Sequence, residues 1–214
     1  RSRGFLLNHK TVQRLMRELG LVCRVRIKKY RSYKGEVGKI APNLLNRDFH
    51  AEKPNLKWVT DVTEFSLFGQ KLYLSPILDL HNGYLVTYTI SERPVLNMVT
   101  SMLNKAFESI PDGTDLILHS DQGWQYQHKQ YQQMLKCKGI QQSMSRKGNC
   151  LDNAVMENFF GILKQEMYYG TTYYSFEELK DAIERYIKYY NEKRIKEKLG
   201  WMSPVEYRLN TLAA

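Results

Sequence analysis

Three acidic residues, Asp61, Asp121 and Glu157, lie where carboxylates could do chemistry. Asp61 falls within an apolar stretch that predicts a central strand, where a buried carboxylate is costly unless it is paired, hydrogen-bonded or bound to a cation. Asp121 follows a short apolar strand, at the kind of strand end where open α/β sheets bind ligands. Glu157 lies on a predicted helix, and one stripe of that helix also carries Asn153 and Lys164.

Each acid has an ordinary alternative role when it is considered alone. Asp61 could accept hydrogen bonds from a loop, Asp121 could form a turn or cap a helix, and Glu157 could be a solvated surface residue. A sheet of the predicted order could nevertheless bring all three into one site. Three oxygen donors without nearby Cys or His ligands suit Mg²⁺ or Mn²⁺ better than zinc. Two such ions, about 4 Å apart, can activate the attacking oxygen and stabilise the leaving one in phosphodiester displacement.

The elements that must position these acids have a regular order. Periodicity predicts three antiparallel strands, then helix, strand, helix, strand and helix, which indicates an α/β fold with a mixed five-stranded sheet and flanking helices. The predicted strands cover residues 58–65, 72–80, 84–90, 115–119 and 140–144. The predicted helices cover residues 9–19, 95–110, 129–138 and 152–167, with a last one that begins at Ser175 in a capping box with Glu178.

The net charge of +10 is concentrated in the first quarter of the chain. Residues 1–54 hold 14 Lys or Arg against 4 acidic residues, whereas residues 55–214 hold 18 of each. This asymmetry predicts a basic arm that neutralises nucleic-acid phosphates, with a merely solvated surface as the alternative. The basic residues expected to contact DNA are Lys10, Arg14 and Arg17 on a short helix, followed by Arg24, Arg26, Lys28 and Lys29.

Cysteine usage and hydropathy exclude other classes of protein. The three cysteines lack a C-x-x-C spacing, so neither a disulfide framework nor a zinc knuckle is indicated. No apolar run approaches the roughly 18 residues of a membrane span. We therefore expect a cytoplasmic protein without a membrane segment.

Other acids and aromatic residues near the expected site have competing roles. Glu64 should point to the opposite face of the strand from Asp61, and Asp79 borders an Asn-Gly hairpin, so both are predicted to be structural. Trp124 and Tyr126 could stack on bases, although buried packing is favoured for at least the tryptophan.

Three motifs give the chain a family resemblance. They are WVTDVT at residues 58–63, LHSDQG at residues 118–123, and SMSRKGNCLDNA at residues 143–154, which leads to Glu157. Between Asp121 and Glu157 lie 35 residues, and a basic residue stands seven positions after Glu157. In order and spacing, the chain resembles the integrase-core (D,D-35-E) transposases of bacterial insertion sequences. It is most similar to the second-reading-frame (OrfB-type) products of frameshifting elements, within the retroviral-integrase-like superfamily, over nearly its whole length.

This resemblance implies a ribonuclease H-like fold and a catalytic, metal-binding triad of Asp61, Asp121 and Glu157 with two Mg²⁺ or Mn²⁺ ions. Water or a 3′-hydroxyl would then attack a phosphodiester, first in cleavage at the element ends and then in strand transfer. Expected partners are DNA, as terminal inverted repeats and target, other copies of the chain, and a first-frame (OrfA-type) protein. Further DNA contacts are expected from Arg146 and Lys147 in a glycine-bearing loop and from Asn153 and Lys164.

The resemblance also suggests how the chain is divided. Residues 1–31 would form a basic, helix-turn-helix-like segment, 32–56 a linker, 57–170 the integrase core and 171–214 a helix with a basic and aromatic tail. Because the family normally has more chain before the position of Asn8, the N-terminal segment is expected to be truncated. The alternative function is therefore a non-catalytic, DNA-binding remnant of an insertion element.

Overall fold

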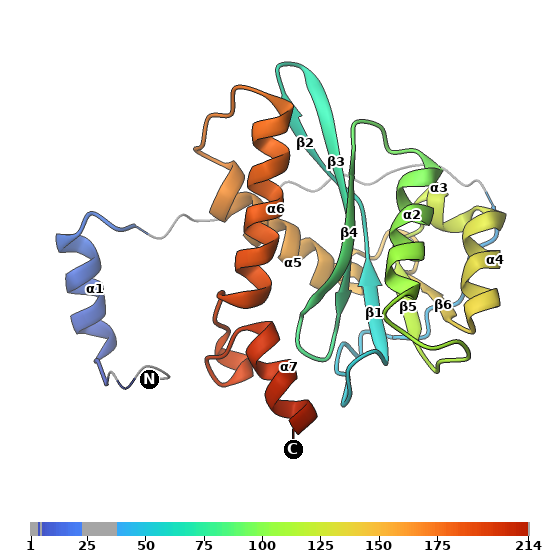
Figure 1. Ribbon diagram of the computed structural model, residues 1–214, viewed down its shortest axis with the longest axis horizontal. Coiled ribbons are helices and arrows are strands. Elements are labelled where there is room, and N and C mark those ends of the chain that lie inside the picture. The colour runs from blue at the N-terminus through green and yellow to red at the C-terminus, as the bar shows by residue number, and fades with distance from the viewer. Residues whose placement is uncertain (1–3, 5, 23–37, 214) are drawn as a thin grey trace.

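The computed structural model describes residues 4, 6–22 and 38–213, and it contains one mixed β-sheet flanked by helices (Figure 1). The strands of this sheet are β1 (Lys57–Thr60), β2 (Thr63–Leu67), β3 (Gln70–Asp79), β4 (Leu85–Ser91), β5 (Ile117–Ser120) and β6 (Gln141–Met144). Strand β3 is antiparallel to β1, β2 and β4, whereas β5 is parallel to both β1 and β6. The predicted α/β fold with a mixed sheet is confirmed.

The first predicted strand is interrupted, which makes six strands instead of five. The expected strand 58–65 divides into β1 and β2 at residues 61 and 62, and both parts pair with the long strand β3. The interruption coincides with a local hydrogen bond, because the Asp61 carboxylate accepts from the backbone N–H of Val62 at 2.7 Å. A side chain that bonds to its neighbouring backbone in this way competes with the sheet ladder. Asp61 therefore lies just beyond the end of β1.

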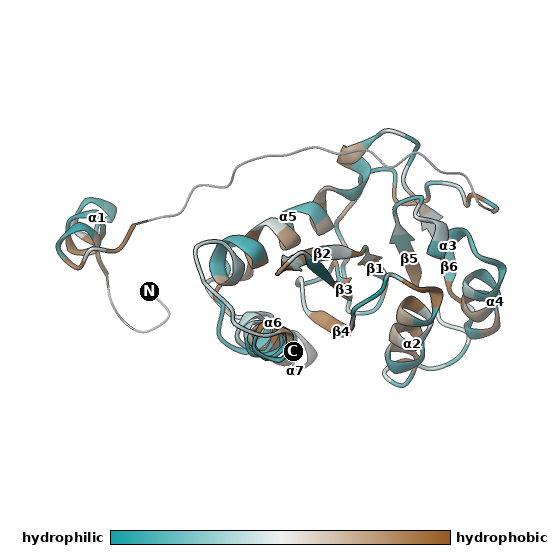
Figure 2. Cartoon of the chain, turned by 90° about the horizontal axis from the view of Figure 1, so that it is seen from above, coloured by the Kyte–Doolittle hydropathy of each residue, from teal (hydrophilic) through white to brown (hydrophobic). Residues whose placement is uncertain are grey.

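Helices cover both faces of the sheet. One core contains Val59, Leu78, Phe159 and Ile183, and so joins the sheet to α5 and α6. The other contains Trp58 and residues of α2 and α4, because alternate residues of β1 point to opposite faces. In Figure 2, hydrophobic colour is visible on β4 and on parts of the helices α2 and α5. The helices and helical turns are α1 (His9–Glu18), α2 (Leu96–Phe107), α3 (Trp124–Gln127), α4 (Lys129–Lys138), η1 (Cys150–Asn153), α5 (Ala154–Leu163), η2 (Lys164–Tyr168), α6 (Phe176–Glu192), η3 (Glu197–Leu199) and α7 (Pro204–Ala213).

Several helix ends lie where the sequence signals predicted them. Asn8 caps α1 by accepting a hydrogen bond from the Lys10 N–H. Ser175 caps α6 by accepting from the Glu178 N–H, while the Glu178 carboxylate accepts from the N–H of Tyr174. The predicted helix 129–138 is confirmed to the residue as α4, and it ends at Gly139 in the left-handed region at φ 82°.

The helix that carries Glu157 is more irregular than predicted. The expected single helix 152–167 begins as the 3₁₀ turn η1, continues as α5 and ends as the π-helical turn η2, which starts at Lys164. The terminal helix α7 was not foreseen in the predicted basic and aromatic tail. No helix in the described ranges is long and apolar enough to cross a membrane.

Candidate active site

The sheet register brings Asp61 and Asp121 together. Strands β1 and β5 are parallel neighbours with Val59 opposite His119, and each strand ends one residue before its aspartate. Because the carboxyl ends of parallel strands meet at one edge of a sheet, the two side chains start from adjacent positions. The sequence-based expectation that Asp121 lies just past a strand end therefore applies to Asp61 as well.

The two carboxylates repel each other in a partly dry environment. Burial raises the pKa of Asp61 well above its usual range, and the neighbouring charge of Asp121 raises it further. Burial likewise raises the pKa of Asp121. Each carboxylate accepts a backbone hydrogen bond, Asp61 from Val62 and Asp121 from the Gly123 N–H at 2.8 Å. These bonds only partly offset the cost of placing two like charges side by side.

Glu157 lies at the edge of this pair. It occupies the first turn of α5, its side chain is exposed, and its charge makes a smaller contribution to raising the Asp61 pKa. In the described part of the chain, no three Asp, Glu, His or Cys side chains are arranged closely enough to hold a metal ion. The fold thus places two of the three predicted acids together, with the third near them and pointing into solvent.

Asn153 joins the start of α5 to Asp61. The residue is 8% exposed, and its side-chain N–H donates to the second Asp61 carboxylate oxygen at 2.8 Å. Its amide oxygen is buried and has no hydrogen-bond partner among the described residues. An orphaned oxygen beside two repelling carboxylates fits a cation, since a hard cation would satisfy all of these oxygens at once. The donor set suits Mg²⁺ or Mn²⁺ on this ground.

Lys164 lies close enough to Asp61 for their charges to interact. Its pKa is lowered by burial, while the charges of Glu64 and Asp61 act in the opposite direction. Its ammonium group lies 5.3 Å from the centre of the Phe65 ring. The lysine begins the π-helical turn η2, and such turns are frequent at functional sites.

Arg146 has an intramolecular partner that the sequence did not suggest. Its guanidinium donates two hydrogen bonds to the buried carboxylate of Asp152, at 2.8 Å each. Half of the Arg146 side chain stays exposed, and Lys147 beside it is exposed too. Asp152 was not among the residues predicted to matter for the site. The one local signal was an acid placed six residues after an arginine in a glycine-bearing loop.

The other predicted DNA contacts lie in the basic arm. Lys10, Arg14 and Arg17 are exposed on α1, where no residue is buried, and Arg14 pairs with Glu18 at 2.6 Å. The predicted contacts Arg24, Arg26, Lys28 and Lys29 lie outside the described residues.

The acids predicted to be structural have structural partners. Glu64 lies on β2, not on the strand that ends before Asp61, so the argument from alternating faces was wrong; its exposed carboxylate pairs with Lys71 at 2.9 Å. Asp79 is fully buried and pairs with Arg208 at 2.8 Å. Of the two aromatic residues that could stack on bases, Tyr126 is buried at 1% exposure, whereas Trp124, for which buried packing was predicted, is only half-buried.

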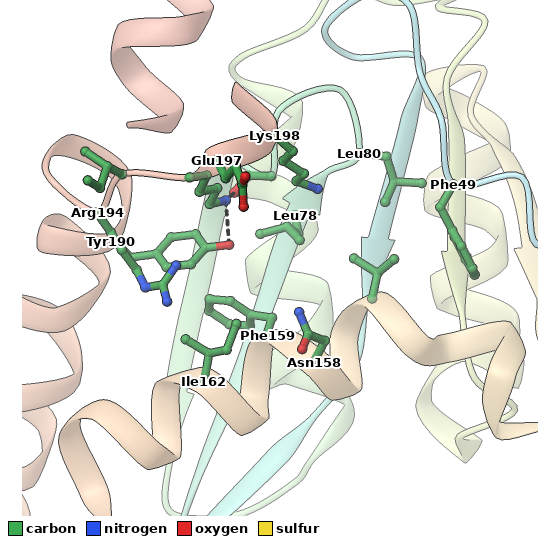
Figure 3. Close-up of a pocket in the computed structure, with 14 residues that line it drawn as sticks. Phe49, Leu78, Leu80, Asn158, Phe159, Ile162, Tyr190, Arg194, Glu197 and Lys198 are labelled. Carbon is green, nitrogen blue, oxygen red and sulfur yellow. Dashed lines mark hydrogen bonds between the residues drawn. The ribbon is translucent and has the colours of Figure 1, made fainter. Parts of the chain in front are cut away.

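A separate pocket of about 760 Å³ lies between α5 and the segment after α6, and none of the three predicted acids lines it. Figure 3 shows Asn158 and Phe159 projecting from α5 toward Tyr190 across this pocket. The Lys196 ammonium group donates to the Tyr190 hydroxyl at 2.9 Å there. Helix α5 therefore borders the acidic site and also this pocket.

Comparisons with known proteins define the class. The family description "Integrase core domain" matches residues 51–150, a second one of the same description matches residues 157–212, and "HTH-like domain" matches residues 1–29. Among solved structures, the catalytic core of HTLV-2 integrase in its trimeric form superposes with a TM-score of 0.57 at 17% identity, over 73% of this chain and 97% of that one. The core of BIV integrase gives the same TM-score at 19% identity, over 74% and 97%. The fold is that of the retroviral integrase cores, and the class is that of the polynucleotidyl transferases.

Relatives of higher identity specify the family. The chain is 57% identical over 208 residues to a putative transposase, InsK, of the insertion sequence IS150 in Escherichia coli, which covers 97% of this chain and 74% of that protein. It is 54% identical over 206 residues to a transposase-like protein of Haemophilus influenzae, over 96% and 95%. The chain belongs to the integrase-core transposases of bacterial insertion sequences, as its motifs indicated.

Proposed function

We propose that this transposase cuts DNA at the ends of its insertion element and joins the resulting 3′-hydroxyls to target DNA, with Asp61, Asp121 and Glu157 as catalytic metal ligands. The observation that carries the proposal is the pair of adjacent carboxylates with raised pKa values beside the orphaned amide oxygen of Asn153. Such a cluster is unfavourable for folding, and a strongly perturbed pair of this kind is typical of a site built for function.

Divalent ions are the counter-charge that this site requires. Two Mg²⁺ or Mn²⁺ ions would activate the attacking oxygen and stabilise the leaving oxygen. Asp61 and Asp121 would hold the ions, because each directly follows the end of a strand that fixes its backbone. Glu157 reaches the site from the first turn of α5 by a change of its exposed side chain, as surface glutamates readily change rotamer. The HTLV-2 integrase core that resembles this chain was determined in complex with magnesium, which supports the choice of ion.

The basic residues, together with Asn153, have a separate task in the proposal. Lys147, Lys164, Asn153 and the exposed half of Arg146 contact the DNA strand near the acids, and the arm with Lys10, Arg14 and Arg17 contacts the terminal repeats. The match of residues 1–29 to a helix-turn-helix-like domain supports the second role. Because phosphate contacts release counterions, each lost lysine or arginine should lower the salt dependence of DNA affinity by about one unit of slope.

We also propose that several copies act together on DNA. Two element ends must be joined to one target, and one of the structural neighbours is an integrase within an intasome. The mass of the protein–DNA complex tests this, and a single copy on paired ends would contradict it. A first-frame partner stays a prediction.

The central experiment uses the purified chain with labelled duplexes that end in the terminal repeats flanking its gene. We expect Mg²⁺-dependent nicking at the 3′ ends and strand transfer, with at least a roughly 10³-fold loss in Asp61→Asn, Asp121→Asn and Glu157→Gln. Glu64→Gln is the matched control, because Glu64 is an acid close to Lys164 that pairs with Lys71 on the surface. It should retain activity.

The same experiment separates the alternative function. Salt-sensitive binding of the terminal repeats without any nicking in Mg²⁺ or Mn²⁺ would favour a non-catalytic remnant. Nicking that survives in the Asp61→Asn and Asp121→Asn proteins would remove these residues from the catalytic set.

A further inference from the structure

The carboxylate of Asp152 joins its own loop to a segment that is more than 100 residues away in sequence. Its side chain is fully buried, and one oxygen accepts from Arg47 at 3.0 Å and from Arg146 at 2.8 Å. The other oxygen accepts from the Arg146 side chain at 2.8 Å, from the Arg146 backbone N–H at 3.0 Å and from the Asn43 amide at 3.0 Å. One carboxylate thus receives five hydrogen bonds, three of them from guanidinium groups. We call Asp152, Arg146, Arg47 and Asn43 the Asp152 clamp.

In the Asp152 clamp, the buried carboxylate has cationic partners, whereas in the acidic site it has a neighbour of like charge. Hydrogen bonds from Arg146 hold the pKa of Asp152 well below its usual range against the opposing effect of burial, with Arg47 contributing in the same direction. Breaking a buried, hydrogen-bonded ion pair on one side leaves an uncompensated charge. The Asp152 clamp therefore fixes the geometry of its segments more firmly than a surface ion pair would.

The backbone of Asp152 is fixed as well, from the side of the sheet. The Asp152 carbonyl oxygen lies 3.0 Å from Nε2 of the fully buried His119, and Nδ1 of that histidine lies 2.8 Å from the Ser143 hydroxyl. Because a carbonyl can only accept, Nε2 carries the proton and Nδ1 accepts from Ser143. His119 lies on β5 two residues before Asp121. The turn η1 is thus tied to the strand that presents one of the proposed catalytic acids.

Directly after Asp152, the chain enters the acidic site. Asn153 donates to Asp61, and Glu157 occupies the first turn of the helix that η1 starts. A displacement of η1 would break the hydrogen bond from Asn153 to Asp61 and would shift the backbone of Glu157. The segment with Asn43 and Arg47 comes from the other direction, since it leads from the basic arm into β1.

We propose that Asp152 is a positioning residue for the acidic site. Through Arg47, the segment between the basic arm and β1 holds Asp152 in place. This inference deepens the proposed function and rests on it. Asp152 touches neither DNA nor metal in this scheme. It acts through Asn153 and through the N-terminus of α5, in the way that outer-shell groups set the ligands of metal sites.

The test measures Mn²⁺ affinity of the full chain by calorimetry and, separately, the single-turnover nicking rate and the DNA dissociation constant. Arg47→Met removes the donor from the arm side, and Asp152→Asn keeps the shape of the clamp while removing its charge. We expect Mn²⁺ affinity and nicking rate to fall about 10-fold or more in both. In Arg47→Met, which leaves the proposed DNA contacts in place, DNA affinity should stay within about twofold of wild type. Arg47→Lys should recover part of the loss, because it restores the charge without the guanidinium geometry.

Lys57→Met is the matched control. Lys57 also holds the segment before β1, by donating to the Asp48 carboxylate at 2.7 Å and to the His50 carbonyl at 2.8 Å, yet it does not touch Asp152. If Lys57→Met loses as much Mn²⁺ affinity as Arg47→Met, the clamp has only a general structural role and the proposal is wrong. Equal Mn²⁺ affinity in wild type and Asp152→Asn would also overturn it.

Amide hydrogen exchange provides a reading that does not depend on metal or activity. Residues 145–157 should exchange faster in Arg47→Met than in Lys57→Met, since the Arg146 N–H is bonded to the Asp152 carboxylate. Unchanged exchange there would count against the clamp. Asp61→Asn identifies the other failure: if it binds Mn²⁺ as wild type does while the clamp variants do not, the proposed ligand set is wrong and the clamp is not.

Discussion

Acidic side chains at the two ends of strand β1 have opposite electrostatic environments. Near its start, Asp79 lies opposite Trp58 in the register and is fully buried with a complete set of partners: Arg208, the Asn55 N–H and the His81 N–H. Just beyond its other end, Asp61 meets the like charge of Asp121. Burial alone therefore does not distinguish a structural carboxylate from one that we propose to be catalytic. The sign of the neighbouring charge does.

One asparagine at each end of β1 shows a similar difference in hydrogen bonding. At the Asp79 end, Asn82 is fully buried, its N–H donates to the Pro204 carbonyl and its oxygen accepts from the Tyr84 N–H. At the Asp61 end, Asn153 is nearly as buried, yet its oxygen has no partner among the described residues. The Asn82 amide is thus satisfied within the fold, whereas the Asn153 amide keeps an oxygen that a ligand could use.

The largest effect on stability is expected from removing the Asp79 carboxylate, whose partners the fold supplies. Asp79→Ala should lower the free energy of unfolding by about 3–5 kcal/mol, because it leaves the mostly buried Arg208 guanidinium and two backbone N–H groups without their acceptor. Urea unfolding followed by tryptophan fluorescence measures this. Glu64→Gln serves as reference, since its half-exposed pair with Lys71 should contribute less than about 1 kcal/mol. A similar loss in both proteins would erase the contrast.

The two ends of β1 were not equally predictable from the sequence. The strands and most helices were predictable because their periodicity is local, and the adjacency of Asp61 and Asp121 arises from two parallel strands that end at equivalent positions. The partners of Asp79 and Asp152 were not, because Arg208 and Arg47 are 129 and 105 residues away from them. Contacts of that range leave no pattern in a single sequence.

Details of the site escaped prediction for a similar reason. The break between β1 and β2 depends on how the Asp61 carboxylate bonds to the Val62 N–H, and alternation of apolar residues carries no sign of it. Tyr126 is more buried than Trp124 because of how the short helix α3 orients the two rings. Periodicity could not predict this helix, which has only four residues. The position of Glu157 relative to the two aspartates depends on a side-chain rotamer on an exposed helix face.

A smaller effect should appear in the pH dependence of stability at the Asp79 end. Burial, with the charges of Lys198 and Arg194 adding to it, lowers the pKa of Lys196 to about 7. The unfolded chain therefore binds more protons than the native chain between about pH 7 and the usual lysine range. Stability must then rise with pH across that window.

Solvent at this half-buried position reduces the effect to about 2 kcal/mol between about pH 6.5 and 9.5. Lys196→Met should flatten that rise, and Lys193→Met, an exposed lysine three residues away, should leave it intact. Unfolding by urea at the two pH values measures both. A rise of the same size in Lys196→Met would assign the pH dependence to other groups.

The smallest effect is expected from removing the charge of Asp61, which lies beside that of Asp121. Asp61→Asn should raise the free energy of unfolding by about 1 kcal/mol at about pH 7 without divalent ions, because it removes one of two repelling charges at a partly buried position. With Mg²⁺ or Mn²⁺ present, wild type should become more stable than Asp61→Asn. At about ten times its dissociation constant, an ion that binds only the native state adds about 1.4 kcal/mol to wild type and little to the variant. Thermal unfolding with and without the ion measures this, with Glu64→Gln responding to the ion as wild type does. If Asp61→Asn is destabilising without metal, the Asp61 carboxylate is supported by the fold in the same way as that of Asp79, and the distinction between the two ends of β1 fails.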